Sequence, residues 1–172
     1  MRPIETLVSE DEIRTRVSEM AEQINADFGD AIPLLVGVLK GCIYFLSDLS
    51  REMGGRCAID FMAVESYEGE TSTGAVKIRM DLGTNIEGRD VLIVEDIVDT
   101  GMTLGYLVEM LEARKPKSLR VASLLFKPGS FRGPRKPDYI GFEIPNDFVV
   151  GYGMDLGEEF RNLKFIGRHA GR

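Results

Sequence analysis

The chain has few of the residues on which several common classes of enzyme and binding protein depend. Its 172 residues include one histidine and two cysteines. His169 lies in a Gly-Arg-His-Ala-Gly-Arg segment, so the sequence offers no Ser-His or Cys-His pair for nucleophilic catalysis. Cys42 and Cys57 are too few for a disulfide framework or a cysteine metal cluster, which is typical of a reduced, cytoplasmic protein.

The chain also lacks a positive net charge and long apolar runs. Its formal net charge is -7 and its pI is near 4.9, which argues against a nucleic-acid binder, because such affinity comes mostly from basic contacts to phosphates. No apolar run approaches the roughly 20 residues that span a membrane, and residues 1–5 contain no signal-peptide core. We therefore expect one domain over residues 1–172, a cytoplasmic location, and neither nucleic-acid nor membrane partners.

One stretch, residues 91–104, organises the rest of the chain. Its first four residues are valine, leucine and isoleucine, which predict a strand buried on both faces of a parallel sheet. We expect this strand to end at the adjacent carboxylates Glu95 and Asp96. A third acid, two threonines and a glycine follow, and helical spacing resumes at Leu104. Ligands of open α/β sheets bind beyond the carboxyl ends of strands, and helix N-termini attract anions, so the stretch predicts a phosphate and sugar site.

Each residue type in this stretch fits such a site. Gly101 allows the backbone N–H groups of the loop to curl round a phosphate, and Thr100 and Thr103 add hydroxyl donors that can also cap the helix. Glu95 and Asp96 would repel a bare phosphate, so their partners would be sugar hydroxyls or a Mg²⁺ ion that carries phosphates. The alternative is an ordinary turn between a strand and a helix, with an acidic rim and threonine caps. The stretch contains neither a Walker Gly-Lys-Thr nor a Gly-x-Gly-x-x-Gly pattern.

The remaining segments alternate between strand and helix patterns, which predicts an α/β fold around a largely parallel sheet. Ser9 and Glu12 form a capping box that begins a helix reaching about Phe28. Residues 66–74 are small, hydroxylated and Gly-rich, and residues 76–82 alternate, so we expect a mobile loop between two antiparallel strands. Further strands are expected at 33–39, 57–65, 119–126, 139–144 and 148–152, a helix from residue 43, and loops at 128–137 and 155–161.

Residues 91–104 resemble the phosphoribosyl-pyrophosphate signature of type I phosphoribosyltransferases: an apolar strand, two acids, an apolar pair and Asp-Thr-Gly-x-Thr. From Leu34 to Gly167 the chain resembles the hypoxanthine-guanine phosphoribosyltransferases of that family. Leu39-Lys40-Gly41 resembles their pyrophosphate loop, in which the bond before the lysine is cis, and residues 66–74 resemble their lid. The resemblance implies an α/β fold with a mostly parallel central sheet flanked by helices, a small hood and a flexible antiparallel lid.

The resemblance also implies a role for particular residues. Asp99 would exchange a proton with purine N7, Lys127 would contact the 6-oxo group, Phe148 would stack on the purine, and Val149 would contact its edge. Glu95, Asp96 and Asp155 would be the metal ligands. The other implied substrate-binding residues are Lys40, Gly41 and Arg161 at the pyrophosphate, Ser66 and Tyr67 in the lid, and Asp99, Thr100, Gly101, Met102, Thr103 and Leu104 around the 5′-phosphate.

The implied activity is purine salvage. The 5-phosphoribosyl group of phosphoribosyl pyrophosphate would pass to N9 of hypoxanthine or guanine, with xanthine as a further candidate, to give IMP or GMP and pyrophosphate. The implied cofactor is Mg²⁺, and the expected assembly is a homodimer or homotetramer. Two rival classes stay open: a regulatory relative that binds nucleotide and nucleic acid, and a receiver-like module that binds Mg²⁺-phosphate through Glu95, Asp96 and Lys127.

Several of these residues also have plain structural interpretations. Lys127 would then be a strand-end lysine, Phe148 a core residue, Asp155 a solvated acid, and Arg161 an ion-pair partner of neighbouring acids such as Glu158. Three features depart from the family pattern: Glu65 before the Ser-Tyr pair, the richness of residues 128–136 in proline and glycine, and the sequence of residues 168–172.

Overall fold

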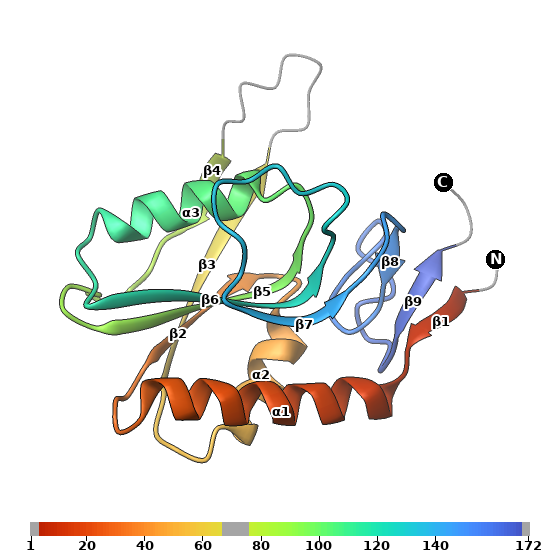
Figure 1. Cartoon of the computed structure of the whole chain (residues 1–172). Helices are drawn as coiled ribbons and strands as arrows, with labels where there is room; N and C mark the ends of the chain where they lie inside the picture. The colour runs from red at the N-terminus through yellow and green to blue at the C-terminus, as the bar shows by residue number, and fades with distance from the viewer. Residues whose placement is uncertain (1–3, 67–75, 170–172) are drawn as a thin grey trace.

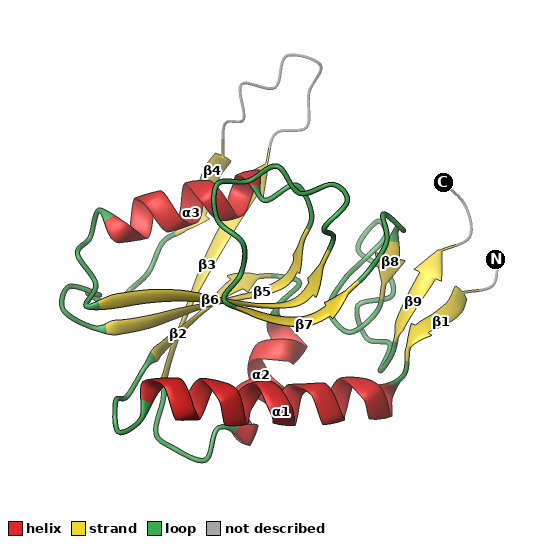
Figure 2. Cartoon of the chain, viewed as in Figure 1, coloured by secondary structure: helices red, strands yellow, loops and turns green. Residues whose placement is uncertain are grey.

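A computed structural model describes residues 4–66 and 76–169 (Figure 1). Over these residues the fold is a large sheet with helices on both faces and a small sheet beside it (Figure 2). No helix in the described part has the length and apolar character needed to cross a membrane. The elements are β1 (Ile4–Val8), α1 (Glu10–Phe28), β2 (Leu34–Leu39), α2 (Ile43–Glu52), β3 (Ala58–Ser66), β4 (Val76–Met80), β5 (Asp90–Val98), α3 (Met102–Glu112), β6 (Ser118–Phe126), β7 (Tyr139–Glu143), β8 (Val149–Val150) and β9 (Ile166–His169).

The described strands of the large sheet have the order β4-β3-β2-β5-β6-β7. The pairs β3·β2, β2·β5, β5·β6 and β6·β7 are parallel, and β4 alone pairs antiparallel, with β3. This mostly parallel sheet confirms the predicted fold class, and the β3·β4 pair confirms the expected antiparallel strands on either side of residues 67–75. The predicted lid itself, apart from Ser66 at the end of β3, lies outside the described residues.

Helix α1 begins at the capping box that the sequence predicts. The Glu12 N–H donates to Ser9 Oγ over 3.3 Å, and the Ser9 N–H donates to Glu12 Oε2 over 2.8 Å. These two bonds satisfy N–H groups that have no partner within the helix. The helix ends at Gly29, whose φ of 56° favours glycine.

The two faces of the large sheet carry separate cores. α1 and α2 cover one face, where Ile13, Val17 and Phe45 pack with Leu92 and other sheet residues. α3 covers the opposite face through Leu104, Leu107, Val108 and Leu111, as Figure 1 shows. Because β5 is buried on both faces, its carboxyl end can emerge only at the edge where the loops of the parallel strands meet.

The central strand is longer than the sequence predicts. β5 does not end at the two carboxylates but continues through Glu95 and Asp96 to Val98. The physical reason is backbone pairing, because β6 runs beside it and Glu95 pairs with Ser123 while Val98 pairs with Phe126. Both acids therefore belong to the sheet and not to the loop that follows it.

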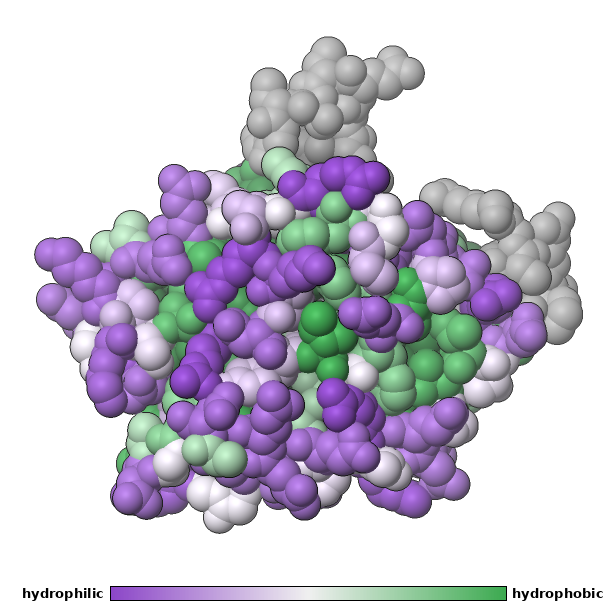
Figure 3. Space-filling model, viewed as in Figure 1, coloured by the Kyte–Doolittle hydropathy of each residue, from purple (hydrophilic) through white to green (hydrophobic). Residues whose placement is uncertain are grey.

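A second sheet, β1-β9-β8, was not predicted from the sequence as a sheet. β9 pairs antiparallel with both β1 and β8, so it joins chain segments near residues 4–8 and 149–150. The strand expected at 148–152 shortens to Val149 and Val150. We assign the expected hood to the sheet β1-β9-β8. In Figure 3 the near face of the molecule is mostly polar, and hydrophobic surface lies over β7 and toward this sheet.

Candidate functional site

The carboxyl ends of β5 and β6 bring Asp99 and Lys127 together. Lys127 Nζ donates to Asp99 Oδ2 over 2.7 Å, and the Lys127 N–H donates to Val98 O over 3.0 Å. The Lys127 side chain is 10% exposed and that of Asp99 is 46% exposed, so the ammonium is enclosed while the carboxylate still reaches solvent. Parallel pairing of neighbouring strands, which the sequence predicts, is what places these two distant residues side by side.

A serine completes the surroundings of the Asp99 carboxylate. Ser130 Oγ donates to Asp99 Oδ1, so each carboxylate oxygen has its own donor. Burial alone would raise the pKa of Asp99, but the hydrogen bonds from Lys127 and Ser130 outweigh it and lower the pKa below its usual value. Asp99 is therefore held as a carboxylate, the form that can accept a proton. The sequence carries no local signal for Ser130, because it lies 31 residues from Asp99.

The expected phosphate loop lies between β5 and α3. Gly101 is the residue before α3 and has a φ of 80°, which confirms the need for glycine there. Gly101 is the N-cap residue of α3 and has no side chain to cap it, but the Met102 N–H donates to Thr100 Oγ1 over 3.5 Å, which confirms that Thr100 can cap the helix, though through a long bond. The N–H groups that follow in the first turn of α3 have no partner within the helix, so they are left for another acceptor, which fits an anion.

The members of this loop differ in what they can offer a ligand. Thr100 is exposed and Thr103 half-buried, so their hydroxyls can reach a phosphate. Leu104 is 2% exposed and packs in the core on the α3 side, so only its backbone is available. The Met102 side chain is exposed, and its backbone N–H belongs to the first turn of the helix.

Glu95 is buried and Asp96 is half-buried at the end of the large sheet. Burial raises the pKa of Glu95 well above its usual value, and the charge of Asp96 adds to this effect. Burial likewise raises the pKa of Asp96 to about 6, although a hydrogen bond from the Ile97 N–H and the charge of Arg161 act in the opposite direction. Two adjacent acids held against their ionisation are a common mark of a site that receives hydroxyls or a cation.

Gly41 brings the end of β2 against Asp96. A Cβ atom at Gly41 would collide with Asp96 Oδ2, and a Cβ at Gly153 would collide with Gly41 O. The bond between Leu39 and Lys40 is cis, as the resemblance implies. Segments that are far apart in the sequence thus meet here with no room for a larger residue than glycine at Gly41 or Gly153.

Charged residues from the 155–161 turn reach the same edge. Arg161 Nη2 lies 2.7 Å from Asp155 Oδ1 and 3.5 Å from Glu158 Oε1. Glu158 Oε2 also accepts from Lys40 Nζ over 2.9 Å. The two cations expected at the pyrophosphate, Lys40 and Arg161, therefore share one carboxylate, and the structural interpretation of Arg161 as a partner of Glu158 is confirmed.

The expected base-pocket residues lie at the start of β8. Phe148 is half-buried, whereas Val149 is buried in the core on the α1 and α2 side and pairs with Arg168 of β9. Val149 can therefore meet a ligand only through backbone atoms, in keeping with its expected role. Of the two lid residues, Ser66 ends β3 and Tyr67 lies outside the described residues.

The three expected metal ligands do not form a metal cage by themselves. Among the described residues, no group of three histidine, cysteine or acidic side chains is arranged to hold a metal ion. The charge of Asp155 raises the pKa of Asp96, and both acids interact with Arg161, which pairs with Asp155 over 2.7 Å. Such a pair fits Mg²⁺, which is usually bound by one or two carboxylates together with substrate phosphates and water.

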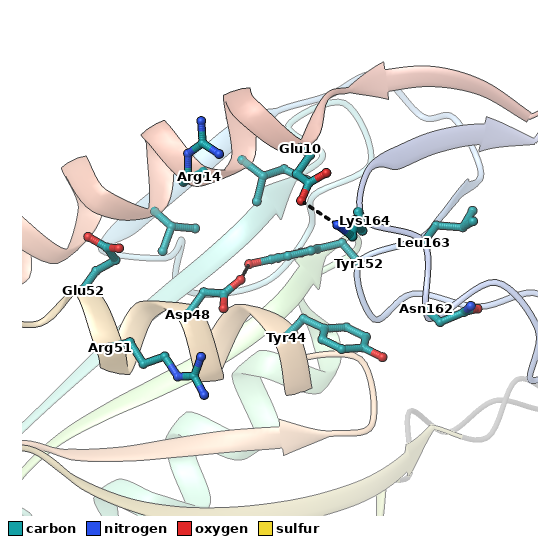
Figure 4. Close-up of a pocket in the computed structure, with 12 residues that line it drawn as sticks. Glu10, Arg14, Tyr44, Asp48, Arg51, Glu52, Tyr152, Asn162, Leu163 and Lys164 are labelled. Atoms are coloured by element: carbon teal, nitrogen blue, oxygen red, sulfur yellow. Dashed lines mark hydrogen bonds and ion pairs between the residues drawn. The ribbon is translucent and has the colours of Figure 1, made fainter.

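A cavity of about 390 Å³ lies between α1, α2 and residues 162–164, and neither Asp99 nor Lys127 lines it (Figure 4). Tyr152, two residues after β8, points into it and donates to Asp48 Oδ2 over 2.5 Å. Burial is the main reason why the pKa of Tyr152 is raised. We place the site at Asp99 and not in this cavity, because the cavity contains none of the expected substrate-binding residues.

Comparisons with known proteins agree with the geometry. Residues 4–156 match the phosphoribosyl transferase domain. The chain is 48% identical over 162 residues to the hypoxanthine-guanine phosphoribosyltransferase of Bacillus subtilis (strain 168), which covers 94% of this chain and 90% of that protein. A crystal structure of a hypoxanthine-guanine phosphoribosyltransferase from Bacillus anthracis has a TM-score of 0.93 and 41% identity, covering 97% of this chain and 99% of the other.

A hypoxanthine phosphoribosyltransferase structure from Staphylococcus aureus has a TM-score of 0.92 and 44% identity, covering 95% of this chain and 90% of the other. Sequence and fold thus agree over nearly the whole chain. The chain therefore belongs to the phosphoribosyltransferase family and, within it, to the hypoxanthine-guanine phosphoribosyltransferases.

Proposed function

We propose that Asp99 and Lys127 are the residues with which this purine-salvage enzyme handles its base, and that the reaction runs at the edge where β5 and β6 end. The enzyme transfers the 5-phosphoribosyl group of phosphoribosyl pyrophosphate to N9 of hypoxanthine or guanine. The observation that carries the assignment is the 2.7 Å contact between Lys127 Nζ and Asp99 Oδ2. This contact places the Lys127 ammonium, a donor suited to a 6-oxo group, beside the Asp99 carboxylate, an acceptor suited to a ring N–H.

The base is recognised by complementary hydrogen bonds. The Lys127 ammonium donates to the purine O6, and an ammonium has no acceptor to offer a 6-amino group. The Asp99 carboxylate accepts from N7–H of the purine tautomer protonated there. The half-buried Phe148 ring stacks on the purine, and backbone atoms of Val149 contact its edge.

The chemical step exchanges one bond at C1 of the ribose for another. The N9 lone pair of the purine forms the new bond to C1, while the bond from C1 to the pyrophosphate oxygen breaks and its electrons leave with pyrophosphate. The N7 proton passes to Asp99 as the ring becomes neutral again. Positive charge develops on the ribosyl centre, and the nearby carboxylates stabilise it.

The donor is held by the surrounding loops. The first N–H groups of α3, with Thr100 and Thr103, bind the 5′-phosphate, and Glu95 and Asp96 face the ribose hydroxyls. The loop at Lys40 and Gly41 binds pyrophosphate, with Arg161 beside it. The remaining assignments from the sequence, Ser66 and Tyr67 over the donor, stay predictions.

Mg²⁺ would be held by the donor's phosphates together with Glu95, Asp96 and Asp155. It would neutralise charge on the leaving pyrophosphate when bound. A single domain, a cytoplasmic location and a homodimer or homotetramer are part of the same proposal.

A coupled assay tests the proposal. With phosphoribosyl pyrophosphate and Mg²⁺, the folded protein should form IMP from hypoxanthine and GMP from guanine, and removal of Mg²⁺ by a chelator should stop both reactions. Absence of both nucleotides with ample Mg²⁺ would contradict the function. The ratio of kcat/KM among hypoxanthine, guanine and xanthine then ranks the bases.

A further inference from the structure

Ser130 lies in the segment of residues 128–136, whose proline and glycine content departs from the family pattern. Its hydroxyl donates to Asp99 Oδ1, on the side of the carboxylate opposite to the Lys127 contact. Ser130 Oγ also lies 3.5 Å from Lys127 O, but one hydroxyl has one proton and the shorter contact is with Asp99. Asp99 is thus held from both sides by residues of one short turn.

This turn is fixed independently of Asp99. The Arg132 N–H donates to Thr100 O over 2.8 Å, and the Phe131 ring packs edge-on against Phe126 at a centroid distance of 5.3 Å. Gly133 lies so close to Gly101 that a Cβ on Gly133 would be 2.7 Å from Gly101 O. The segment therefore covers the phosphate loop, and Ser130 is positioned by contacts to its neighbours in the chain.

We propose that Ser130 is a positioning residue for Asp99, holding one carboxylate oxygen in place while Lys127 moves from the other oxygen to the purine. The inference rests on the proposed function. Before the base binds, both carboxylate oxygens have donors. When the 6-oxo group attracts the Lys127 ammonium, Oδ2 loses its donor and can accept the N7 proton.

Without Ser130, the released carboxylate would have no fixed contact and could rotate away from N7. Misorientation of a proton acceptor lowers the rate of the chemical step more than it weakens binding of the donor. A serine suits this task because its hydroxyl adds one donor and no charge. A second cation at this position would compete with Lys127 for the same carboxylate.

The test compares Ser130→Ala and Ser130→Thr with the parent enzyme. Loss of a hydrogen bond to a charged group predicts that Ser130→Ala lowers kcat about tenfold or more. The KM for phosphoribosyl pyrophosphate should stay within about twofold, and Ser130→Thr, which keeps the hydroxyl, should recover most of the lost rate. In an Asp99→Asn background, Ser130→Ala should have no further effect on kcat.

Ser118→Ala is a matched control. Ser118 Oγ donates to Asp90 Oδ1 over 2.6 Å at the opposite ends of the same two strands, so its loss should leave kcat unchanged. Ser130→Cys, a weak donor of similar size, replaces the alanine variant if the latter does not fold and should show the same loss.

The inference is overturned if Ser130→Ala keeps kcat within about twofold of the parent, if Ser130→Thr is as slow as the alanine variant, or if the loss persists undiminished beside Asp99→Asn. An inactive parent enzyme would instead contradict the proposed function, so the two failures are distinguishable.

Discussion

Lys127 Nζ and Asp99 Oδ2 form an ion pair 2.7 Å long at the adjoining ends of β6 and β5. The pair has a consequence for substrate choice, because a purine must replace both halves of it. A 6-oxopurine protonated at N7 offers an acceptor to the ammonium and a donor to the carboxylate. Adenine offers a 6-amino group, which cannot accept from the ammonium and draw it away from Asp99, so Oδ2 would not be released to accept the N7 proton.

The first prediction concerns Lys127. Loss of a buried, charged hydrogen bond costs about 1.5–3 kcal/mol, so adenine should be at least about tenfold poorer than hypoxanthine in kcat/KM. Lys127→Ala should depress activity on hypoxanthine and guanine far more than it weakens donor binding, and it should reduce the discrimination against adenine. Steady-state kinetics with the three bases, together with the Kd of the donor, measure both effects.

Lys117→Ala is the matched control for that variant. Lys117 Nζ pairs with Asp90 Oδ2 over 3.0 Å at the opposite ends of the same strands, and it is largely exposed. Its removal should leave base preference unchanged. The assignment of Lys127 fails if adenine reacts as efficiently as hypoxanthine, or if Lys127→Ala leaves the ratio of the two bases as it was.

The second prediction concerns proton transfer by Asp99. Asp99→Asn keeps the shape of the side chain but removes its capacity to accept a proton, so kcat should fall by roughly 10²–10⁴-fold while the donor still binds. Asp90→Asn, at the other end of β5, makes the same chemical change outside the site. A kcat of Asp99→Asn within about twofold of the parent would remove Asp99 from the proton-transfer role.

The sequence predicted those parts of the fold that depend on local patterns. α1 follows from the capping box at Ser9 and Glu12, and it ends at Phe28, as predicted. β2 and β6 follow from apolar runs that are buried on both faces, as parallel strands are. In the site, the resemblance assigned Asp99 and Lys127 each to the purine, but their direct contact, which depends on β5 and β6 being neighbours in the sheet, was not predicted.

The parts that the sequence did not predict depend on contacts between distant residues. The continuation of β5 past Glu95 depends on backbone pairing with β6. β1 and β9 form a sheet only because Ile4–Val8 and Ile166–His169 meet in space, and neither segment carries a strong strand pattern. Ser130 reaches Asp99 across 31 residues, through a turn whose path depends on packing against Phe126.

The third prediction uses the pKa of Asp96, which burial raises from 3.8 to about 6. Between about pH 4 and about pH 6, the folded protein therefore binds more protons than the unfolded chain does. The contribution of Asp96 to the free energy of unfolding thus falls as the pH rises through this range. Asp96→Asn removes the titration. The variant should therefore be more stable than the ligand-free parent near neutral pH, by at most about 3 kcal/mol, with a smaller difference at low pH.

Urea unfolding of parent and Asp96→Asn at several pH values between about 4 and about 7.5 measures this difference. Because the charge of Asp96 also raises the pKa of Glu95, the measured difference combines the loss of the Asp96 titration with the change in that of Glu95. A difference in the free energy of unfolding that stays constant over the whole range would contradict the proposed burial effect. Mg²⁺ and the donor should reduce the difference at neutral pH, because they favour the ionised parent.

The fourth prediction arises from the carboxylate that Lys40 and Arg161 share. Glu158 accepts from Lys40 Nζ over 2.9 Å and lies 3.5 Å from Arg161 Nη2, so it occupies both cations that the proposed function assigns to pyrophosphate. The hydrogen bond from Lys40 is the main reason why the pKa of Glu158 is lowered, so it stays ionised in neutral solution. With the proposed roles of Lys40 and Arg161, pyrophosphate would compete with this carboxylate for both cations.

Glu158→Gln should therefore strengthen binding of pyrophosphate and lower the KM for phosphoribosyl pyrophosphate. The change should be modest, about two- to fivefold, because exposed ion pairs contribute little and are screened by salt. Glu159→Gln is the matched control, because it removes the same charge at the next residue, and in the described structure Glu159 has only backbone contacts with Leu156. Comparison of the two variants therefore separates the loss of the Glu158 contacts from a general change in net charge.

Isothermal titration with pyrophosphate and Mg²⁺ at low and high salt measures the effect, which should shrink as salt increases. Equal Kd values of pyrophosphate for the two variants would show that Glu158 acts only through its charge at a distance. A higher Kd for Glu158→Gln than for the parent would mean that Glu158 helps to order Lys40 and Arg161.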